Sequence, residues 1–220
     1  MTELFDCADP VQREAGIASG ISALKGGRLV VMPTDTVYGI AADAFDSDSV
    51  AALLSAKGRG RDMPVPVLVG SWHTIQGLVY SVPQGAHELI RAFWPGALSL
   101  VVRQAPSLQW DLGDAHGTVM LRMPLHPVAI ELLREVGPMA VSSANISGRP
   151  AANTAGEARE QLGDLVEVYL DGGPAEQQAA STIVDLTGTH PRILRPGPVT
   201  VDAIAGVLGI EAAALTTQTD

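Results

Sequence analysis

The sequence predicts an α/β fold in which helices flank a mixed sheet. Short apolar runs rich in Val, Ile and Leu alternate along the chain with longer segments of helical periodicity. In places two apolar runs follow one another with no helical segment between them. This mixture of βα and ββ order excludes a purely parallel sheet, because parallel neighbours need a crossover connection.

The first helix is expected between Asp9 and Gly26. Asp9 is a good cap, Pro10 suits the first turn, and Gly26-Gly27 ends the segment. The apolar face of this helix is expected to consist of Val11, Ala15, Ala18, Ile21 and Leu24.

A strand is expected over 28–32, and Pro33 ends it because proline cannot donate to a sheet ladder. Ser47 is the expected cap of a second helix that carries Lys57 in its last turn and stops at Gly58. The later strands are expected over 64–69, 97–103, 118–123, 139–142, 166–170, 181–186 and 192–194. The later helices are expected over 86–93, 128–136, 155–162 and 201–208.

At 220 residues the chain is long enough to bury a self-sufficient core, and no linker or repeat divides it. We therefore expect one domain over 1–210 and a flexible tail over 211–220. No apolar run is long enough to cross a membrane, and the N-terminus lacks a basic region followed by an apolar one. These observations favour a cytoplasmic protein without a membrane partner.

Composition excludes several classes of site. Cys7 is the only cysteine, so the chain has no disulfide framework and no thiolate cluster. The five histidines show no metal-ligand spacing, which predicts no protein-held metal. The net charge of -10 argues against a surface that coats nucleic acid, so any polyanion must meet a local basic patch.

Two polar turns follow apolar strands. PTDTVYG over 33–39 offers hydroxyls and a carboxylate, and SSANISG over 142–148 offers hydroxyls and an amide. Ligands in open α/β sheets commonly bind at strand ends. Either turn alone is as well explained by side chains that satisfy their own turn backbone, but their recurrence favours a site.

Cations lie beside these turns. Lys57-Gly58-Arg59-Gly60-Arg61 combines a flexible backbone with three positive charges, while Arg122 and Arg195 each end a strand before a proline. Exposed basic runs and strand-end arginines are usually solvated surface residues. Guanidinium groups also suit forked binding of carboxylate and phosphate. GxxxxGK[ST], GxGxxG and GxSxG are all absent, so a bound nucleotide would use another loop, and a serine-nucleophile hydrolase is unsupported.

Six motifs in this order resemble the YrdC-type family, the L-threonylcarbamoyladenylate synthases, from about residue 16 to 198. They are PTDTVYG (33–39), KGR (57–59), TVMLRMP (118–124), SSANISG (142–148), STIVD (181–185) and ILRPG (193–197). The resemblance implies a twisted, open, mixed and mainly parallel sheet flanked by helices, with a concave central cavity.

The resemblance also implies an activity. L-Threonine, bicarbonate and ATP would be joined to give threonylcarbamoyl-AMP and pyrophosphate, a nucleotidyltransferase reaction that supplies threonylcarbamoyladenosine modification of tRNA. Mg²⁺ would arrive with ATP, because the sequence offers no all-protein cage for it. Downstream tRNA-modifying proteins, and possibly tRNA itself, would be further partners.

Carried over motif by motif, the family's roles fall on nine residues. The threonine site would consist of Thr36, Arg122 and Ser181. The nucleotide, its phosphates and the carbamoyl oxygens would be contacted by Lys57, Arg59, Thr118, Ser143, Asn145 and Arg195. Among these, the catalytic group would be Lys57, Arg59, Ser143 and Asn145.

The chain departs from the family pattern at two positions. Gly60 replaces the proline of KxRP, and Leu68 stands where some members carry a histidine near the threonine pocket. The chain resembles the short members that lack an extra C-terminal domain. Two other readings remain open: an assembly factor that binds double-stranded RNA or tRNA on the concave surface, and a related ATP-dependent carbamoyl transferase with another acceptor.

Overall fold

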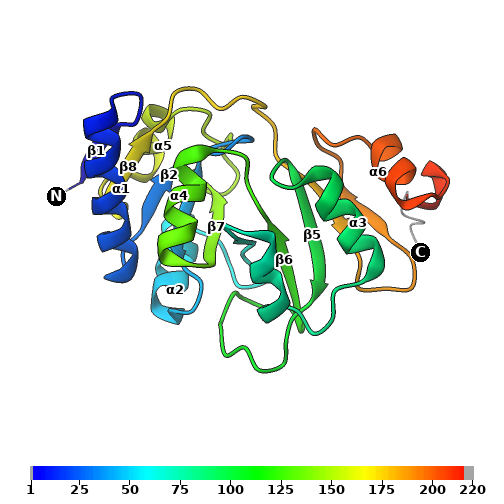
Figure 1. The fold of residues 1–220 in the computed structure, drawn as a ribbon. Coiled ribbons are helices and arrows are strands. Elements are labelled where there is room, and N and C mark those ends of the chain that lie inside the picture. The colour runs from blue at the N-terminus through cyan, green and yellow to red at the C-terminus, as the bar shows by residue number, and fades with distance from the viewer. Residues whose placement is uncertain (1, 216–220) are drawn as a thin grey trace.

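One ten-stranded mixed sheet forms the centre of the protein, and helices lie against it (Figure 1). The computed structural model describes residues 2–215. Within them the strand order is β1-β8-β2-β3-β7-β4-β6-β5-β9-β10. The strands are β1 (Glu3–Asp6), β2 (Val30–Met32), β3 (Gly39–Asp43), β4 (Val67–Leu68), β5 (Leu98–Arg103), β6 (Thr118–Arg122), β7 (Met139–Ser143), β8 (Val168–Asp171), β9 (Thr182–Asp185) and β10 (Arg192–Arg195).

Helices connect many of the strands. The α-helices are α1 (Pro10–Lys25), α2 (Ser47–Ala56), α3 (Gln84–Phe93), α4 (Pro127–Val136), α5 (Ala155–Leu162) and α6 (Val201–Leu208). The 3-10 helices are η1 (Trp72–Gly77), η2 (Gly163–Leu165) and η3 (Ala212–Leu215). Every helix expected from the sequence is present. No helix within the described range is both long and apolar enough to span a bilayer.

The predicted mixed sheet is confirmed, but its pairings are not mainly parallel. Among the described strands, β1-β8, β8-β2, β4-β6 and β5-β9 pair in parallel. The other five pairings, β2-β3, β3-β7, β7-β4, β6-β5 and β9-β10, are antiparallel. Three of these five join strands that are consecutive in the chain, so ββ connections contribute more to the sheet than the sequence indicated.

Both faces of the sheet are buried at β2. Val30 and Met32 of β2 belong to a core cluster that includes residues of α1 and α4. Val31, between them, belongs to the cluster on the opposite face, which includes residues of α2 and α5. Successive side chains of a strand point to opposite faces, so a strand covered on both sides reads as one continuous apolar run.

The two N-terminal helices differ in detail from expectation. Asp9 caps α1 as predicted, but Asp46, not Ser47, caps α2, because the Asp46 carboxylate accepts the backbone N–H groups of Asp48 and Ser49. Val11, Ala15 and Ala18 of the expected α1 face are exposed. Leu24 of that face is buried as predicted, and Ile21 is partly buried against the core. The other buried residues of α1 are Gly16, Ile17, Gly20 and Ala23.

Glycines explain the rotated face of α1. A Cβ atom at Gly16 would lie 2.7 Å from Cβ of Phe5 and 2.9 Å from Cδ2 of Leu170. These distances are shorter than van der Waals contact, so only glycine lets the helix approach the β1 and β8 side chains this closely. A hydrophobicity pattern does not count glycine as apolar, so it misses Gly16 and Gly20 and gives the correct face only at Ile21 and Leu24.

Two strands, β1 and β3, were not expected. β1 is an edge strand of sequence ELFD, too polar to read as a strand. β3 begins at Gly39, where the first polar turn ends, and it pairs antiparallel with β2, Met32 facing Gly39. The PTDTVYG segment is therefore the connection between two adjacent strands.

The predicted tail is partly ordered. Ala212–Leu215 form η3, and Leu215 is fully buried in the core cluster that includes Ile204 of α6. The prediction of a flexible tail therefore does not hold for this segment, because one apolar side chain anchors it. Residues 216–220 of the predicted tail lie outside the described residues.

We predict that Gly16→Ala destabilises the protein by about 1–2 kcal/mol. The overpacking of a close helix contact should outweigh the stabilisation that comes from the higher helix propensity of alanine. Gly206→Ala in α6 is the matched control, since a Cβ there meets nothing within 4 Å. It should raise the free energy of unfolding by roughly 0.5–1 kcal/mol. Urea denaturation measures both, and equal effects would contradict the packing argument.

Candidate active site

A cavity of about 280 Å³ lies over the middle of the sheet. Six adjacent strands, β3, β7, β4, β6, β5 and β9, supply its floor through alternate residues that point to the same face. Those floor residues are Gly39, Val141, Ser143, Leu68, Met120, Arg122, Ser99 and Ile183. The cavity is therefore a concave part of one sheet face, and loops complete its walls.

Arg122, at the end of β6, forms the centre of the cavity. Its Nη2 donates to Oδ1 of Asp35 at 2.6 Å and its Nη1 to Oγ1 of Thr36 at 2.8 Å, while Nε donates to the carbonyl of Gly96 at 2.9 Å. The side chains of Arg122 and Asp35 are only 7% and 5% exposed. Burial lowers the pKa of Arg122, and the Asp35 carboxylate opposes that shift.

The β2–β3 connection places Asp35 and Thr36. Oγ1 of Thr34 lies 3.0 Å from Oγ1 of Thr36 and donates to the carbonyl of Val37 at 2.6 Å, which closes a tight turn. Asp35 also accepts the backbone N–H of Leu125 at 2.8 Å. The hydroxyl groups of this turn thus satisfy its backbone and also line the cavity. The motif therefore both stabilises its own turn and contributes to the candidate site.

Tyr38 fixes the same connection to the segment that follows β8. Its hydroxyl donates to the carbonyl of Gly173 at 2.6 Å and accepts the N–H of Gly172 at 3.0 Å. Burial raises the pKa of Tyr38 well above its usual value. A side chain that is 0% exposed and fully hydrogen-bonded holds the turn against the loop that follows β8.

A second polar corner surrounds Ser181, just before β9. Its hydroxyl lies 2.8 Å from Oγ of Ser99 and accepts a hydrogen bond from Nη2 of Arg195 at 3.1 Å. Nε of Arg195 donates to the carbonyl of Ser181 at 2.9 Å. Partial burial lowers the pKa of Arg195. β10 therefore delivers a guanidinium to the cavity beside a pair of serine hydroxyls.

The end of α2 determines where Lys57 and Arg59 point. Gly58 has φ +58°, its N–H donates to the carbonyl of Ser55, and the N–H of Arg59 donates to the carbonyl of Leu54. This is a Schellman motif, in which glycine takes the left-handed position. The reversal sends Arg59 into the cavity, where its Nη1 donates to Oγ of Ser142 at 3.2 Å.

Lys57 is buried, with 2% of its surface exposed. Its Nζ donates to the carbonyl of Ser143 and, at 2.7 Å, to that of Asn145. Burial and, secondarily, the charge of Arg59 lower the pKa of Lys57 to about 8. In this structure the ammonium group therefore holds the 143–147 loop and does not line the cavity.

Six of the nine predicted residues line the cavity: Thr36, Arg59, Arg122, Ser143, Ser181 and Arg195. Asn145 lies behind the wall, where its Nδ2 donates to the carbonyls of Ile146 and Arg149. Thr118 is at the other end of β6 from Arg122, roughly 13 Å along the strand, and its hydroxyl donates to the carbonyl of Ala115.

Four polar groups of the site were not among the predicted residues: the carboxylate of Asp35 as the partner of Arg122, and the hydroxyls of Thr34, Ser99 and Ser142. Ser99 carried a signal, because it is one hydroxyl within the apolar strand LSLVV. The side chains of the described residues form no group of three or more His, Cys, Asp or Glu that could hold a metal ion.

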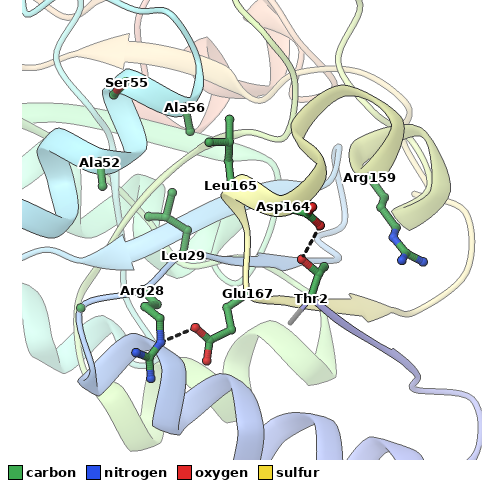
Figure 2. A pocket seen from close by; sticks show the side chains of 11 residues that line it. Thr2, Arg28, Leu29, Ala52, Ser55, Ala56, Arg159, Asp164, Leu165 and Glu167 are labelled. Carbon is green, nitrogen blue, oxygen red and sulfur yellow. Dashed lines mark hydrogen bonds and ion pairs between the residues drawn. The ribbon is translucent and has the colours of Figure 1, made fainter.

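A larger hollow of about 750 Å³ lies elsewhere, between α2, η2 and the end of α1 (Figure 2). Figure 2 shows that Arg28 pairs with Glu167 and that Thr2 bonds to Asp164 across it. None of the nine predicted residues lines this hollow. Its two basic side chains are balanced by two acidic ones, whereas the cavity over the sheet gathers three arginines, so the smaller cavity is the better candidate.

The chain is similar to known proteins over most of its length. The family model Sua5_yciO_yrdC, described as "Telomere recombination", matches residues 22–197. The "Putative threonylcarbamoyl-AMP synthase" of Mycobacterium tuberculosis (strain ATCC 25618 / H37Rv) is 80% identical over 215 residues, which are 98% of this chain and 99% of that protein. The "Threonylcarbamoyl-AMP synthase" of Bacillus subtilis is 36% identical over 88% of this chain and 56% of its own.

A solved structure extends the comparison to the whole fold. The crystal structure of P. abyssi Sua5 complexed with L-threonine matches with a TM-score of 0.90 and 31% identity. The match covers 98% of this chain and 63% of the Sua5 chain, so the chain spans about three-fifths of that protein. The predicted mixed sheet flanked by helices and the family resemblance are thereby confirmed. On the family match and these identities, the chain belongs to the Sua5/YciO/YrdC family.

Proposed function

We propose that this protein is an L-threonylcarbamoyladenylate synthase, a nucleotidyltransferase that joins L-threonine, bicarbonate and ATP to give threonylcarbamoyl-AMP and pyrophosphate. The observation that carries the proposal is the convergence of Arg59, Arg122 and Arg195 on one cavity in a chain of net charge -10. All three substrates are anionic or carry a carboxylate. A local cationic cavity offsets their mutual repulsion, which at ~4 Å reaches several kcal/mol in a partly screened site.

Threonine fits the part of the cavity around Arg122. Three of the five guanidinium N–H groups are engaged by Gly96, Asp35 and Thr36. One N–H remains on each terminal nitrogen, which suits a carboxylate. Thr36 and Ser181 both line the cavity, and in this proposal their hydroxyl groups contact the amine and side chain of the substrate.

The nucleotide side of the site is assigned to Arg59, Ser143 and Arg195. These residues line the cavity and present donors to phosphate and carbamoyl oxygens. Lys57 and Asn145 act in this proposal as positioning residues, because their polar groups hold the loop that carries Ser143. Thr118 does not line the cavity, so its predicted contact with the nucleotide requires the adenosine to extend over that end of β6.

The size of the cavity indicates which parts of the substrates it can enclose. A volume of about 280 Å³ is at the lower end of the range for small-molecule sites, about 300–1,000 Å³. It suits threonine with its one-carbon unit and the α-phosphate, so the remainder of ATP extends through the open side. Mg²⁺ would enter with the triphosphate and neutralise part of its charge.

The chemistry needs no protein nucleophile. The ammonium group of threonine first loses a proton to solvent, and the neutral amine then attacks the carbon of bicarbonate, which releases water and gives a carbamate. A carbamate oxygen then attacks the α-phosphorus, and the bond to the pyrophosphate oxygen breaks. Positioning and charge stabilisation by the arginines accelerate both steps. The product is suited to supply threonylcarbamoyl groups to tRNA-modifying proteins, and a cytoplasmic location follows from that role.

We predict that the protein releases pyrophosphate from ATP only when threonine and bicarbonate are both present. The measurement is a coupled pyrophosphate assay with each substrate left out in turn, followed by identification of threonylcarbamoyl-AMP by mass spectrometry. Turnover that persists without threonine would contradict the assignment and indicate another carbamoyl acceptor. Tight RNA binding with a steep salt dependence and no turnover would instead indicate a binding protein.

We predict that Arg122→Lys raises the KM for threonine by at least about tenfold, because an ammonium group cannot reproduce the forked contact. The KM for ATP should change much less, since Arg122 is not assigned to the nucleotide. Arg134→Lys, on α4 outside the cavity lining, is the matched control. Unchanged threonine affinity in Arg122→Lys would remove Arg122 from the threonine site.

We predict a pH-dependent difference in stability between the wild type and Lys57→Met. The pKa of Lys57 falls from an ordinary 10.5 to about 8 on folding. Between these values the unfolded chain binds more protons, so this residue makes wild-type stability rise with pH, by up to about 3 kcal/mol. The rise should be absent from Lys57→Met.

The measurement is the free energy of urea unfolding from pH 7.5 to 10.5, taken as the difference between the two proteins. Taking the difference cancels the titration of other groups. Lys25→Met is the matched control, because Lys25 is exposed at the end of α1. Parallel curves for the wild type and Lys57→Met would show that folding does not lower the pKa of Lys57.

A further inference from the structure

The segment 58–64, which carries Arg59 into the cavity, is attached to a second loop by Arg61. Nη1 of Arg61 donates to Oδ2 of Asp111 at 2.9 Å, and Nη2 donates to Oδ1 of the same carboxylate at 2.7 Å. Nε of Arg61 lies 3.4 Å from Oδ1 of Asp114. A forked pair with a second carboxylate nearby is the geometry in which exposed ion pairs contribute measurably.

Backbone contacts reinforce this attachment. The N–H of Asp114 donates to the carbonyl of Arg61 at 2.8 Å, and that of Val65 donates to the carbonyl of Leu112 at 2.9 Å. Gly113 has φ +96°, and a Cβ there would lie 2.8 Å from the carbonyl oxygen of Arg61. The two loops therefore form one strap, with a glycine at the point of closest approach.

The loop that carries Asp111 is fixed on its other side. The neighbouring Trp110 is 8% exposed, and its Nε1 donates to Oε1 of Gln104 at 3.0 Å. The indole also stacks on Phe45, with the ring centroids 5.5 Å apart. The packed indole of Trp110 thus fixes the position of Asp111. The ion pair between Asp111 and Arg61 in turn restrains the segment 58–64.

Arg59 has little else to fix its position. Its two side-chain hydrogen bonds, to Oγ of Ser142 and to the carbonyl of Pro64, are 3.2 and 3.3 Å long, at or beyond the upper end of the usual range. Its Nε is buried and has no partner among the described residues. The direction of this guanidinium is therefore set mainly by the backbone on either side, which is the segment that Arg61 ties down.

We propose that Arg61 is a positioning residue that acts through its forked ion pair with Asp111 and keeps Arg59 directed at the phosphate side of the cavity. The inference rests on the proposed function for its kinetic consequence. Arg61 itself does not line the cavity. In this proposal Arg59 binds an anionic group of the substrate, whereas Arg61 binds the carboxylate of Asp111 within the protein.

The alternative is that Arg61 contacts the phosphates of ATP directly. The two roles predict opposite effects for Asp111→Asn. If Arg61 acts on substrate, removing Asp111 frees its guanidinium and removes a repelling anion, so ATP should bind equally well or better. If Arg61 acts on Arg59 through Asp111, losing either partner should impair ATP binding to a similar extent.

The test compares the wild type with Arg61→Gln, Asp111→Asn and the double variant in the pyrophosphate assay. Each single variant should raise the KM for ATP by about three- to fivefold, with the KM for threonine within about twofold of wild type. The double variant should be no worse than either single one, because both changes break the same pair. Arg28→Gln, which breaks the exposed Arg28–Glu167 pair at the distant hollow, should leave both constants unchanged.

Hydrogen exchange of the peptide covering 58–65 provides a readout independent of turnover. Exchange should be faster in both single variants than in wild type and in Arg28→Gln. Absence of threonine-dependent turnover in the wild type would refute the proposed function. Hydrogen exchange would still test whether the Arg61–Asp111 pair restrains the segment 58–64. Unchanged exchange in both variants, or a lower KM for ATP in Asp111→Asn, would overturn the positioning role of Arg61.

Discussion

The buried ion pair between Arg122 and Asp35 is the interaction on which the site depends. A guanidinium that is almost fully buried needs a partner, because an unpaired charge in such a place is strongly destabilising. Asp35 provides that partner from a turn 87 residues earlier in the chain. The pair leaves part of the guanidinium fork free, so the same contact that makes the charge tolerable also orients it toward the cavity.

The sheet and its hydrogen bonds explain why several cations can line one cavity without strongly destabilising the fold. β2 is covered on both faces, whereas the faces of β6, β5 and β9 that carry Arg122, Ser99 and Ile183 contribute to the floor of an open cavity. Burial lowers the pKa of Arg122, Arg59 and Arg195 alike. Each of these costs is offset by hydrogen bonds to serine or threonine hydroxyls and to carbonyl groups.

Much of this could be predicted from the sequence, and the failures have physical causes. The bounds of α5 and α6 were predictable because a threonine cap and a following glycine mark each end. The buried face of α1 was not, because glycines do not register as apolar. The motifs indicated the cavity residues, but a residue type does not show whether Lys57 points at a ligand or at a backbone carbonyl. The Arg122–Asp35 pair joins distant segments, and no local pattern encodes it.

Recognition of the threonine carboxylate by the Arg122 fork is the central claim. Its most direct test is calorimetric titration of the wild-type protein with L-threonine and with L-threoninamide, which differ at the carboxyl group. The account predicts that L-threonine binds at least about tenfold more tightly, because the neutral amide cannot accept two charge-assisted hydrogen bonds. Equal affinity for the two compounds would contradict it.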